Sequence, residues 1–205
     1  MKPLIEDFDK VLVVEGYSDL RFYAEILEYV GLGNQVFIQE ITNRAGLTVS
    51  LETLLKPDIL ATKRMIGVIV DADNAPSRNA QRLEASLTQI CGQTVSTGQW
   101  SSKTPRIGLW LAPGGGVAGE IETLVWRSWS NDPANSQTKL CVENYIACMR
   151  SAGVVARSPD KGLVSTVLAV RNDEDPRLGP GAQARVFDFS RPEYSDLCQF
   201  LKGFA

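Results

Sequence analysis

The feature that most constrains the fold is an apolar segment, residues 66–70, which stops at two aspartates. The segment Ile66-Gly67-Val68-Ile69-Val70 carries no charge and is rich in β-branched residues, and Asp71 and Asp73 follow it. Such a run predicts a strand buried on both faces, which is typical of a parallel sheet covered by helices. The aspartates then lie at the carboxyl end of the strand, where open α/β sheets bind ligands.

The two aspartates are expected to form a pair. Side chains alternate along a strand, so Asp71 and Asp73 project to the same side, with Cα atoms roughly 6.6 Å apart. Two like charges so placed repel each other unless a cation lies between them, and the pair therefore predicts a divalent metal site. The same residues also fit a turn-forming Asp/Asn cluster that leads into Pro76.

Short apolar runs alternate with helical patterns through the first half of the chain. This alternation indicates an α/β fold with a central parallel sheet flanked by helices. Strands are expected at residues 11–14, 36–38, 66–70 and 107–111. Helices are expected at 18–30 with Ser18 as N-cap, at 47–59 with Pro57 near the end, and around 83–90.

After residue 113 the pattern becomes helical. The expected elements are helices at 117–129, 137–151 and 163–170, a loop at 172–184, a short apolar segment at 186–189 and a final helix that includes 194–201. We therefore expect an α/β core over residues 1–115 and a helical C-terminal part over residues 116–205, packed on the same domain.

Composition excludes several classes of protein. The chain has no histidine, which removes Ser-His-Asp and Cys-His catalysis and histidine-ligated zinc. A net charge of −3 argues against a strong nonspecific nucleic-acid binder, although a bound cation and a local basic face can act against that average. No apolar run reaches the length of a membrane span, and the start of the chain is acidic, so a cytoplasmic protein without membrane contact is expected. The four cysteines are widely spaced and are expected to be buried thiols.

Further acidic residues are expected near the aspartate pair. Glu15 ends the first strand as Asp71 ends the third, and Asp19 follows Glu15 by one helical turn. If the two strands are neighbours, these carboxylates converge on one rim, and such hard oxygen ligands suit Mg²⁺ or Mn²⁺. The alternative for Asp19 is a favourable negative charge in the first turn of a helix.

These motifs resemble the Toprim domain, which topoisomerases, primases, small ribonuclease-maturase proteins and nucleases of the overcoming-lysogenization-defect type share. The resemblance rests on a strand ending Val14-Glu15-Gly16, with Asp19 after it, and a second strand ending Asp71-Ala72-Asp73. It covers about residues 9–112, and the whole chain is similar to small stand-alone Toprim-like proteins of unknown function. The resemblance implies Mg²⁺-dependent phosphoryl transfer on nucleic acid, with DNA and RNA both open as substrates.

The resemblance also implies roles for individual residues. Metal ligation is implied for Glu15, Asp19, Asp71, Asp73 and, through a second metal, Glu122. Glu15 is also implied as a general acid/base, and Lys161 as an assisting lysine. Glu122 otherwise fits a solvated helix charge, and Lys161 a surface lysine. Contacts with phosphates are considered for Arg21, Arg78, Arg82 and Lys103.

Partners follow from what the chain lacks. It offers no partner domain with a nucleophilic tyrosine and no primase module, so topoisomerase or primase activity by this chain alone is not expected. The nuclease branch usually has an ATPase alongside, and without a Gly-x-x-x-x-Gly-Lys-Ser/Thr motif that ATPase would be a separate protein. The sequence leaves the oligomeric state open.

Two alternatives to a nuclease or related phosphotransferase are kept. The first is a non-catalytic regulatory or adaptor domain that acts through a partner protein. The second is a nucleotide-binding enzyme, because the segment 114–119 matches Gly-x-Gly-x-x-Gly after a strand and before a helix. That fingerprint belongs to a βαβ unit, and the sequence after Trp129 offers no following strand.

Overall fold

The centre of the protein is a sheet of four parallel strands, seen in a computed structural model that describes residues 4–41, 46–156 and 158–205. The strands are β1 (Lys10–Val14), β2 (Phe37–Glu40), β3 (Met65–Asp71) and β4 (Arg106–Ala112), in the order β2-β1-β3-β4. Every neighbouring pair is parallel, so the four carboxyl ends meet at one edge. The predicted α/β fold with a parallel sheet is confirmed.

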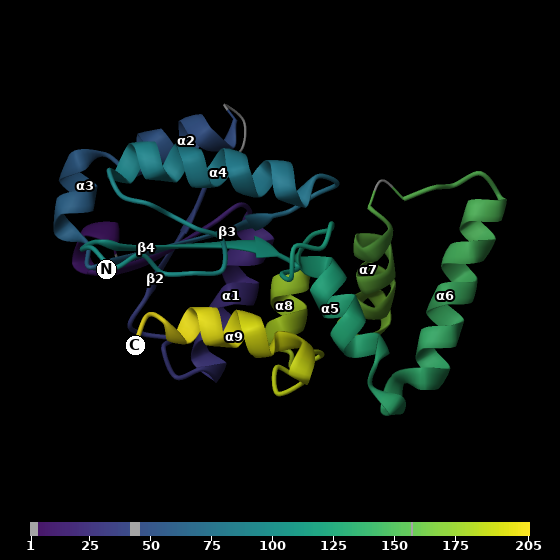
Figure 1. Cartoon of the computed structure of the whole chain (residues 1–205). Helices are drawn as coiled ribbons and strands as arrows, with labels where there is room; N and C mark the ends of the chain where they lie inside the picture. The colour runs from purple at the N-terminus through teal and green to yellow at the C-terminus, as the bar shows by residue number, and fades with distance from the viewer. Residues whose placement is uncertain (1–3, 42–45, 157) are drawn as a thin grey trace.

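Helices cover both faces of this sheet (Figure 1). One face carries α2 (Leu47–Leu54) and α4 (Pro76–Cys91), while α3 (Pro57–Thr62) lies toward the amino ends of the strands. The other face carries α1 (Tyr17–Tyr29), α8 (Leu178–Gln183) and α9 (Ser195–Lys202). Alternate strand residues face these two layers: Val11 and Val13 belong to one buried core, and Leu12 and Val14 to the other. The strands are therefore apolar on both sides, as the uninterrupted runs predicted.

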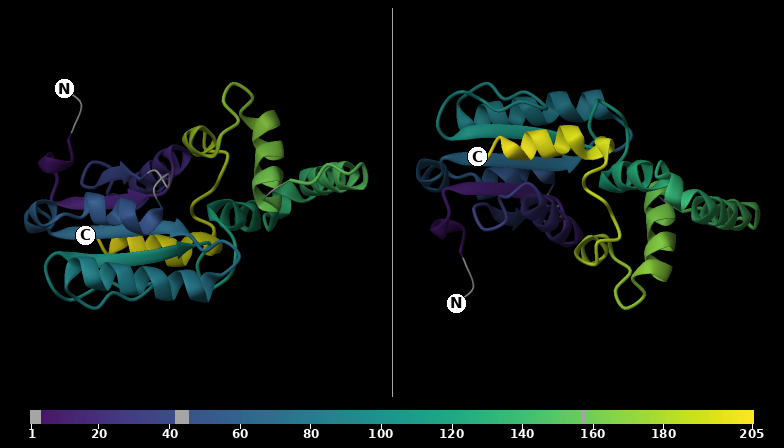
Figure 2. Two further views of the ribbon diagram at one scale, coloured as in Figure 1. Left: turned by 90° about the horizontal axis from the view of Figure 1, so that it is seen from above. Right: turned by 90° about the horizontal axis from the view of Figure 1, so that it is seen from below.

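Three helices extend beyond the carboxyl edge of the sheet (Figure 2). They are α5 (Ile121–Ser130), α6 (Ser136–Ser151) and α7 (Pro159–Arg171). α5 and α7 pack on each other and contribute to the core below the sheet. α6 packs mainly on α7, and Val142 is its one buried residue. Three short 3₁₀ helices complete the described chain: η1 (Ile5–Asp7), η3 (Pro133–Asn135) and η4 (Pro192–Tyr194).

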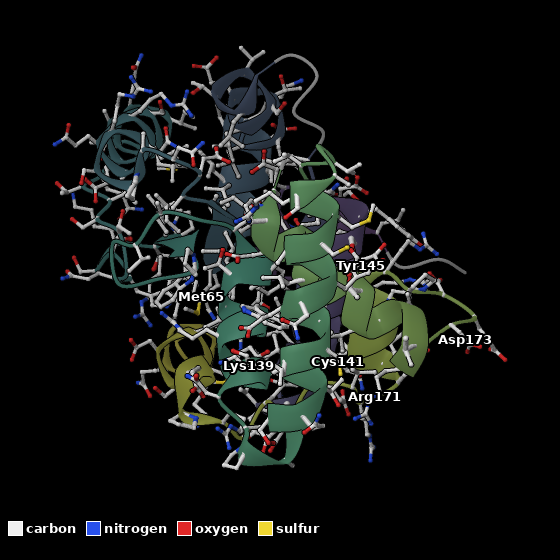
Figure 3. All side chains as sticks on the ribbon, turned by 90° about the vertical axis from the view of Figure 1, so that its right-hand side faces the viewer. Met65, Lys139, Cys141, Tyr145, Arg171 and Asp173 are labelled. Carbon is white, nitrogen blue, oxygen red and sulfur yellow. The ribbon has the colours of Figure 1, made fainter. Side chains whose placement is uncertain are left out.

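The exposed face of α6 corrects the prediction for the cysteines. Cys198 is buried and Cys91 half-buried, but Cys141 and Cys148 are exposed on α6. Figure 3 shows Cys141 beside Lys139 and Tyr145 on this outward helix. Cysteine is usually buried, and the prediction fails here because α6 has a packing partner on one side only.

Some predicted boundaries are also wrong. The N-cap of α1 is Gly16, so Ser18 lies within the first turn of the helix. Pro57 begins α3 instead of ending α2, because its fixed φ suits the first position of a helix.

The predicted loop at 172–184 contains a helix, α8, because two glycines let it pack closely. A Cβ on Gly179 would collide with Arg21 and stand 2.8 Å from the carbonyl oxygen of Ser18 on α1. A Cβ on Gly181 would collide with Leu168 on α7. Glycine at these two positions therefore allows α8 to fit against both helices.

In the described ranges of the chain, none of the helices has both the length and the apolar character needed to cross a membrane.

Candidate functional site

The junction between β3 and α5 fixes the position of Asp71. Asp71 is the last residue of β3, and its Oδ1 accepts a hydrogen bond of 3.0 Å from the backbone N–H of Ile121, the first residue of α5. The first N–H groups of a helix have no partner within it and favour a negative charge nearby. Asp71 is therefore held by the sheet on one side and by a helix N-terminus on the other.

Three further carboxylates surround this junction. β1 and β3 are neighbours, which brings Glu15, the residue after β1, to the edge that Asp71 occupies. Asp19 lies in the first turn of α1, and Glu122 lies in the first turn of α5. We call Glu15, Asp19, Asp71 and Glu122 the inner cluster. The expected convergence of Glu15, Asp19 and Asp71 is supported by the effect of their charges on one another.

Burial and like charge both act on the inner cluster. Burial, followed by the charges of Asp19, Glu122 and Glu15, raises the pKa of Asp71 to about 8. Burial, together with Glu122 and Glu15, raises the pKa of Asp19 to about 7, although Lys161 opposes the shift. The pKa of Glu122 is also raised, with burial the largest cause. The cluster therefore favours the uptake of positive charge, as a proton or as a cation.

Lys161 supplies part of that positive charge. Its Nζ lies 3.3 Å from Glu122 Oε1 and 3.3 Å from Glu120 Oε2, and the side chain is still 54% exposed. Burial opposes its charge, but Glu122 and Glu120 outweigh that effect and raise the pKa of Lys161. Lys161 is thus a charged lysine at the open side of the inner cluster. The structure thus brings Lys161 beside Glu122.

The N-terminus of α7 carries Lys161 to this position. Ser158, the N-cap of α7, donates a short hydrogen bond to Glu120, the N-cap of α5. Thr123 Oγ1 donates a 2.6 Å hydrogen bond to Asp160 Oδ2. These contacts join the first turns of α5 and α7. None of these supporting residues was predicted, because their partners are 37 and 38 residues apart in the chain.

Tyr23 is a further residue that the sequence patterns did not single out. Its side chain is buried, and burial together with the charges of Asp19, Asp71 and Glu122 raises its pKa well above the usual value. The phenol therefore keeps its proton and remains a hydrogen-bond donor. The available signal was its position four residues after Asp19, which places both on one face of α1.

Asp73 departs from the predicted geometry. β3 ends at Asp71, and Asp73 has a left-handed backbone with φ of 51°. Its N–H and C=O each form a 2.8 Å hydrogen bond with Gly119, as an isolated antiparallel bridge. The alternation expected for a continuing strand is therefore wrong, because aspartate at a turn tolerates this conformation and the chain reverses there. Asp73 is exposed, and it is not among the charges that raise the pKa of Asp71.

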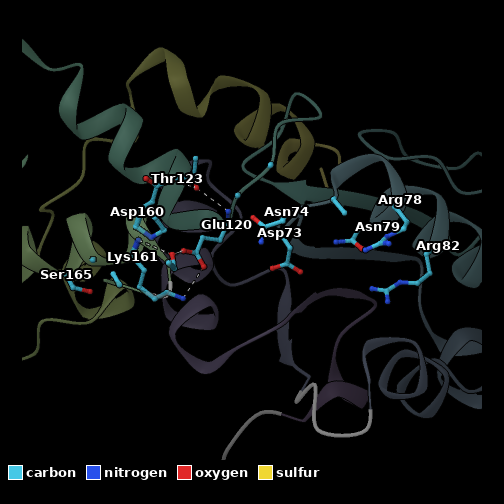
Figure 4. A pocket seen from close by; sticks show the side chains of 17 residues that line it. Asp73, Asn74, Arg78, Asn79, Arg82, Glu120, Thr123, Asp160, Lys161 and Ser165 are labelled. Atoms are coloured by element: carbon cyan, nitrogen blue, oxygen red, sulfur yellow. Dashed lines mark hydrogen bonds and ion pairs between the residues drawn. The ribbon is translucent and has the colours of Figure 1, made fainter. Parts of the chain in front are cut away.

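Asp73 instead lines an open groove of about 1110 Å³ (Figure 4). One wall is formed by Asp73, Asn74, Ala75, Arg78, Asn79 and Arg82. The first turns of α5 and α7, with Glu120 and Lys161, form the other. A second recess of about 400 Å³ is lined by Asp19, Glu122 and Lys161. Lys161 therefore lines both the groove and the recess, and the recess is the one of the two that members of the inner cluster line.

The chemistry of the inner cluster fits a hard divalent cation. All four donors are carboxylates, and oxygen donors are the ligands that Mg²⁺ and Mn²⁺ prefer. No group of three or more His, Cys, Asp or Glu side chains within the described ranges is already arranged to hold an ion. Metal binding would therefore require some rearrangement of the side chains.

The glycine segment 114–119 serves the turn between β4 and α5. Gly114, Gly115, Gly116 and Gly119 all have positive φ. A Cβ on Gly119 would collide with Thr123, whose Cβ it would approach to 3.0 Å. In the described chain only helices follow β4, so this segment is outside the βαβ unit of a dinucleotide-binding motif.

Comparison with known proteins gives a family without an assigned activity. Residues 9–205 match the family described as "Protein of unknown function (DUF3226)". Because this match spans nearly the whole chain, the protein belongs to that family. No curated protein and no solved structure matches it.

Proposed function

We propose that this member of the DUF3226 family is a Toprim-like, Mg²⁺- or Mn²⁺-dependent nuclease, or a related phosphotransferase, that acts on nucleic-acid phosphodiesters. The observation that carries the proposal is the inner cluster, where burial and like charge raise the pKa of Asp19 to about 7 and that of Asp71 to about 8. Strongly shifted pKa values in an open cleft are typical of functional sites. The resemblance of the strand ends to the Toprim domain agrees with this choice.

The residues of the inner cluster would hold the metal. When bound, Mg²⁺ or Mn²⁺ would stabilise charge on the phosphate oxygens and orient the attacking water. Asp71 is fixed by the N–H of Ile121, and Asp19 lies in the first turn of α1. Glu15 would act as a ligand or as the general acid/base, and Asp73 would approach from the groove as a further ligand.

Lys161 and Tyr23 would act beside the metal ligands. Lys161 Nζ neutralises Glu120 and Glu122, and in the complex it would donate to a nonbridging phosphate oxygen at the mouth of the groove. Tyr23, which keeps its proton, would hold the orientation of the buried carboxylates.

The proposal is tested by cleavage of labelled single-stranded and duplex DNA and RNA with Mg²⁺, with Mn²⁺ and with EDTA. We expect metal-dependent cleavage that Asp71→Asn or Glu15→Gln abolishes, while circular dichroism shows a retained fold. Asp58→Asn is the matched control, because Asp58 is exposed on α3, at the other end of the sheet (Figure 1). Full activity in both site variants would refute the assignment.

The proposal also includes the cellular compartment and a partner protein. A cytoplasmic location agrees with the free thiols of Cys141 and Cys148, because a reducing compartment preserves exposed thiols. An ATPase that works with this chain would be a separate protein.

A non-catalytic adaptor is the second candidate. The outer surface of the helical arm, by which we mean α5, α6 and α7, favours it. Leu140 and Tyr145 on α6, and Val154 and Val155 after it, are exposed large apolar residues. Such side chains are often contact points for other proteins. Pure protein that binds Mn²⁺ but cleaves none of the four nucleic-acid forms, and that co-purifies with another subunit, would favour this role over the nuclease.

A further inference from the structure

Two arginines of α4, Arg78 and Arg82, lie on the same side of the groove as Asp73, and we call this pair the arginine wall. Arg78 and Arg82 lie one helical turn apart on α4, and both are exposed and line the groove. Figure 4 shows both side chains on the wall opposite Lys161. Residues four apart on a helix have Cβ atoms about 5–6 Å apart, so the two guanidinium groups can contact neighbouring anionic groups.

These arginines have no carboxylate partner, unlike several others in the protein. In the described part of the chain, no Asp or Glu oxygen lies within 4.0 Å of a nitrogen of Arg78 or Arg82. Ion pairs or aromatic contacts engage Arg21, Arg64, Arg106, Arg177 and Arg191. Arg78 and Arg82 are therefore available to an anion without loss of an existing ion pair.

The shape of the groove and its arginine side point to an extended polyanion, although Asp73, Glu120 and Asp160 also line the groove. Its volume of about 1110 Å³ exceeds that of most small-molecule pockets, and the Arg pair and Lys161 stand on opposite walls. Hydroxyl and amide groups also line the groove, including those of Asn74, Thr123 and Ser165. Such groups, together with arginine, make most protein contacts to phosphate and sugar. A nucleic-acid strand meets both requirements better than a single small anion does.

We propose that Arg78 and Arg82 bind successive phosphates of a nucleic-acid strand and thereby position the strand along the groove beside the inner cluster. This inference rests on the proposed function. It names the residues that would contact the nucleic-acid substrate outside the metal site. The guanidinium fork matches the geometry of phosphate oxygens and accounts for the choice of arginine. Arg21 and Lys103 are not part of this wall.

The test measures binding without cleavage. Fluorescence anisotropy follows a labelled single-stranded DNA or RNA oligonucleotide in EDTA, at several salt concentrations. In the double variant Arg78→Gln/Arg82→Gln we expect at least a tenfold loss of affinity. The salt slope should fall by about 1.4, because each phosphate contact on a single strand contributes about 0.7.

The matched control is Arg150→Gln/Arg171→Gln, which removes the same charge from exposed sites on α6 and α7. Figure 3 labels Arg171 on the outer side of the arm. We expect less than a twofold change in this control. An equal loss in both double variants would overturn the proposal, because net charge alone would then explain binding. A poly-glutamate probe that binds more tightly than the oligonucleotide, with the same arginine dependence, would also overturn it and assign the wall to an acidic protein.

A cleavage assay separates this inference from the proposed function. If the wild-type protein binds the oligonucleotide through the arginine pair but cleaves nothing with Mg²⁺ or Mn²⁺, the nuclease assignment fails and the binding wall stands. If the protein cleaves and the double variant has an unchanged KM, the nuclease stands and the binding wall fails. A raised KM with little change in kcat supports both.

Discussion

The inner cluster and the arginine wall of the groove lie at the same edge of one sheet, yet they use charge in opposite ways. The inner cluster brings together one buried and three half-buried carboxyl groups with one lysine, so the positive charge available does not match the negative charge. The arginine wall presents exposed positive side chains without partners in the described chain. At 4 Å, a pair of charges interacts by about 4 kcal/mol near a protein surface but only about 1 kcal/mol in water. The cluster should therefore govern metal affinity and stability, and the wall should govern salt-dependent binding.

The largest expected effect is a separation of these two properties by mutation. We expect Asp19→Asn to weaken Mn²⁺ binding about a hundredfold, since even outer-shell partners of a metal contribute 10–100-fold. Oligonucleotide binding in EDTA should be unchanged. Isothermal titration calorimetry and anisotropy measure the two, and Arg78→Gln/Arg82→Gln should show the reverse pattern. A parallel loss of both properties in either variant would contradict the comparison.

The next effect concerns the packing that supports α1. Gly179→Ala places a methyl group against Arg21 and 2.8 Å from the carbonyl oxygen of Ser18, so we expect the free energy of unfolding to fall by about 1–3 kcal/mol. Chemical denaturation measures this change. Gly162→Ala on α7 is the control, because its new methyl would meet only side-chain atoms, at 3.3 Å or more. We also expect Gly179→Ala to weaken Mn²⁺ binding and to leave oligonucleotide binding in EDTA unchanged.

The pH dependence of stability should come mainly from the inner cluster. Folding raises the pKa of Asp71 to about 8 and that of Asp19 to about 7, so the folded state favours the protonated forms. Their contribution is complete below the unfolded pKa and is lost as pH rises toward 8. Without metal, the free energy of unfolding should fall by roughly 4 kcal/mol between pH 6 and 8, because both groups lose protons in this range that the unfolded chain no longer holds.

Thermal denaturation in EDTA measures this pH dependence, and Mn²⁺ should remove most of it. Asp71→Asn should flatten the curve, whereas Asp58→Asn should leave it as in the wild type. A wild-type curve that stays level from pH 6 to 8 would show that the cluster is less buried than its geometry indicates.

The smallest effect on stability is expected at Lys161, which stands between the two regions. Its side chain is 54% exposed, so Lys161→Met should change the free energy of unfolding by less than about 1 kcal/mol. Because Lys161 lowers the pKa of Asp19 and of Glu122, its loss should move the rise of activity to higher pH. A pH–rate profile tests this against Lys139→Met, which removes an exposed i,i+4 pair on α6. An unshifted pH–rate profile would show that Lys161 does not affect the pKa values of the inner cluster.

The sheet and the core of the candidate site were predictable because both depend on local patterns. Uninterrupted apolar runs identified the four strands, and parallel strands place their carboxyl ends together, so Glu15 and Asp71 had to share an edge once β1 and β3 were neighbours. Glu122 and Lys161 were proposed as site residues only because of the resemblance to the Toprim domain.

The features that were missed depend on contacts between distant segments. α8 forms where two glycines permit close packing on α1 and α7, and its own sequence reads as a loop. The exposure of Cys141 depends on α6 having a packing partner on one side only. Tyr23 becomes part of the site only because strands and helices far apart in sequence surround it.

Because Asp73 has a left-handed backbone, substitutions at this position can remove its carboxylate without disturbing the turn. Only Gly, Asn and Asp readily adopt a φ of 51°, so the choice of replacement decides which property is lost. Asp73→Gly or Asp73→Asn removes the negative charge while the paired hydrogen bonds to Gly119 persist. A β-branched residue would disturb both, and an alanine scan at this one position would confuse a lost ligand with a distorted loop.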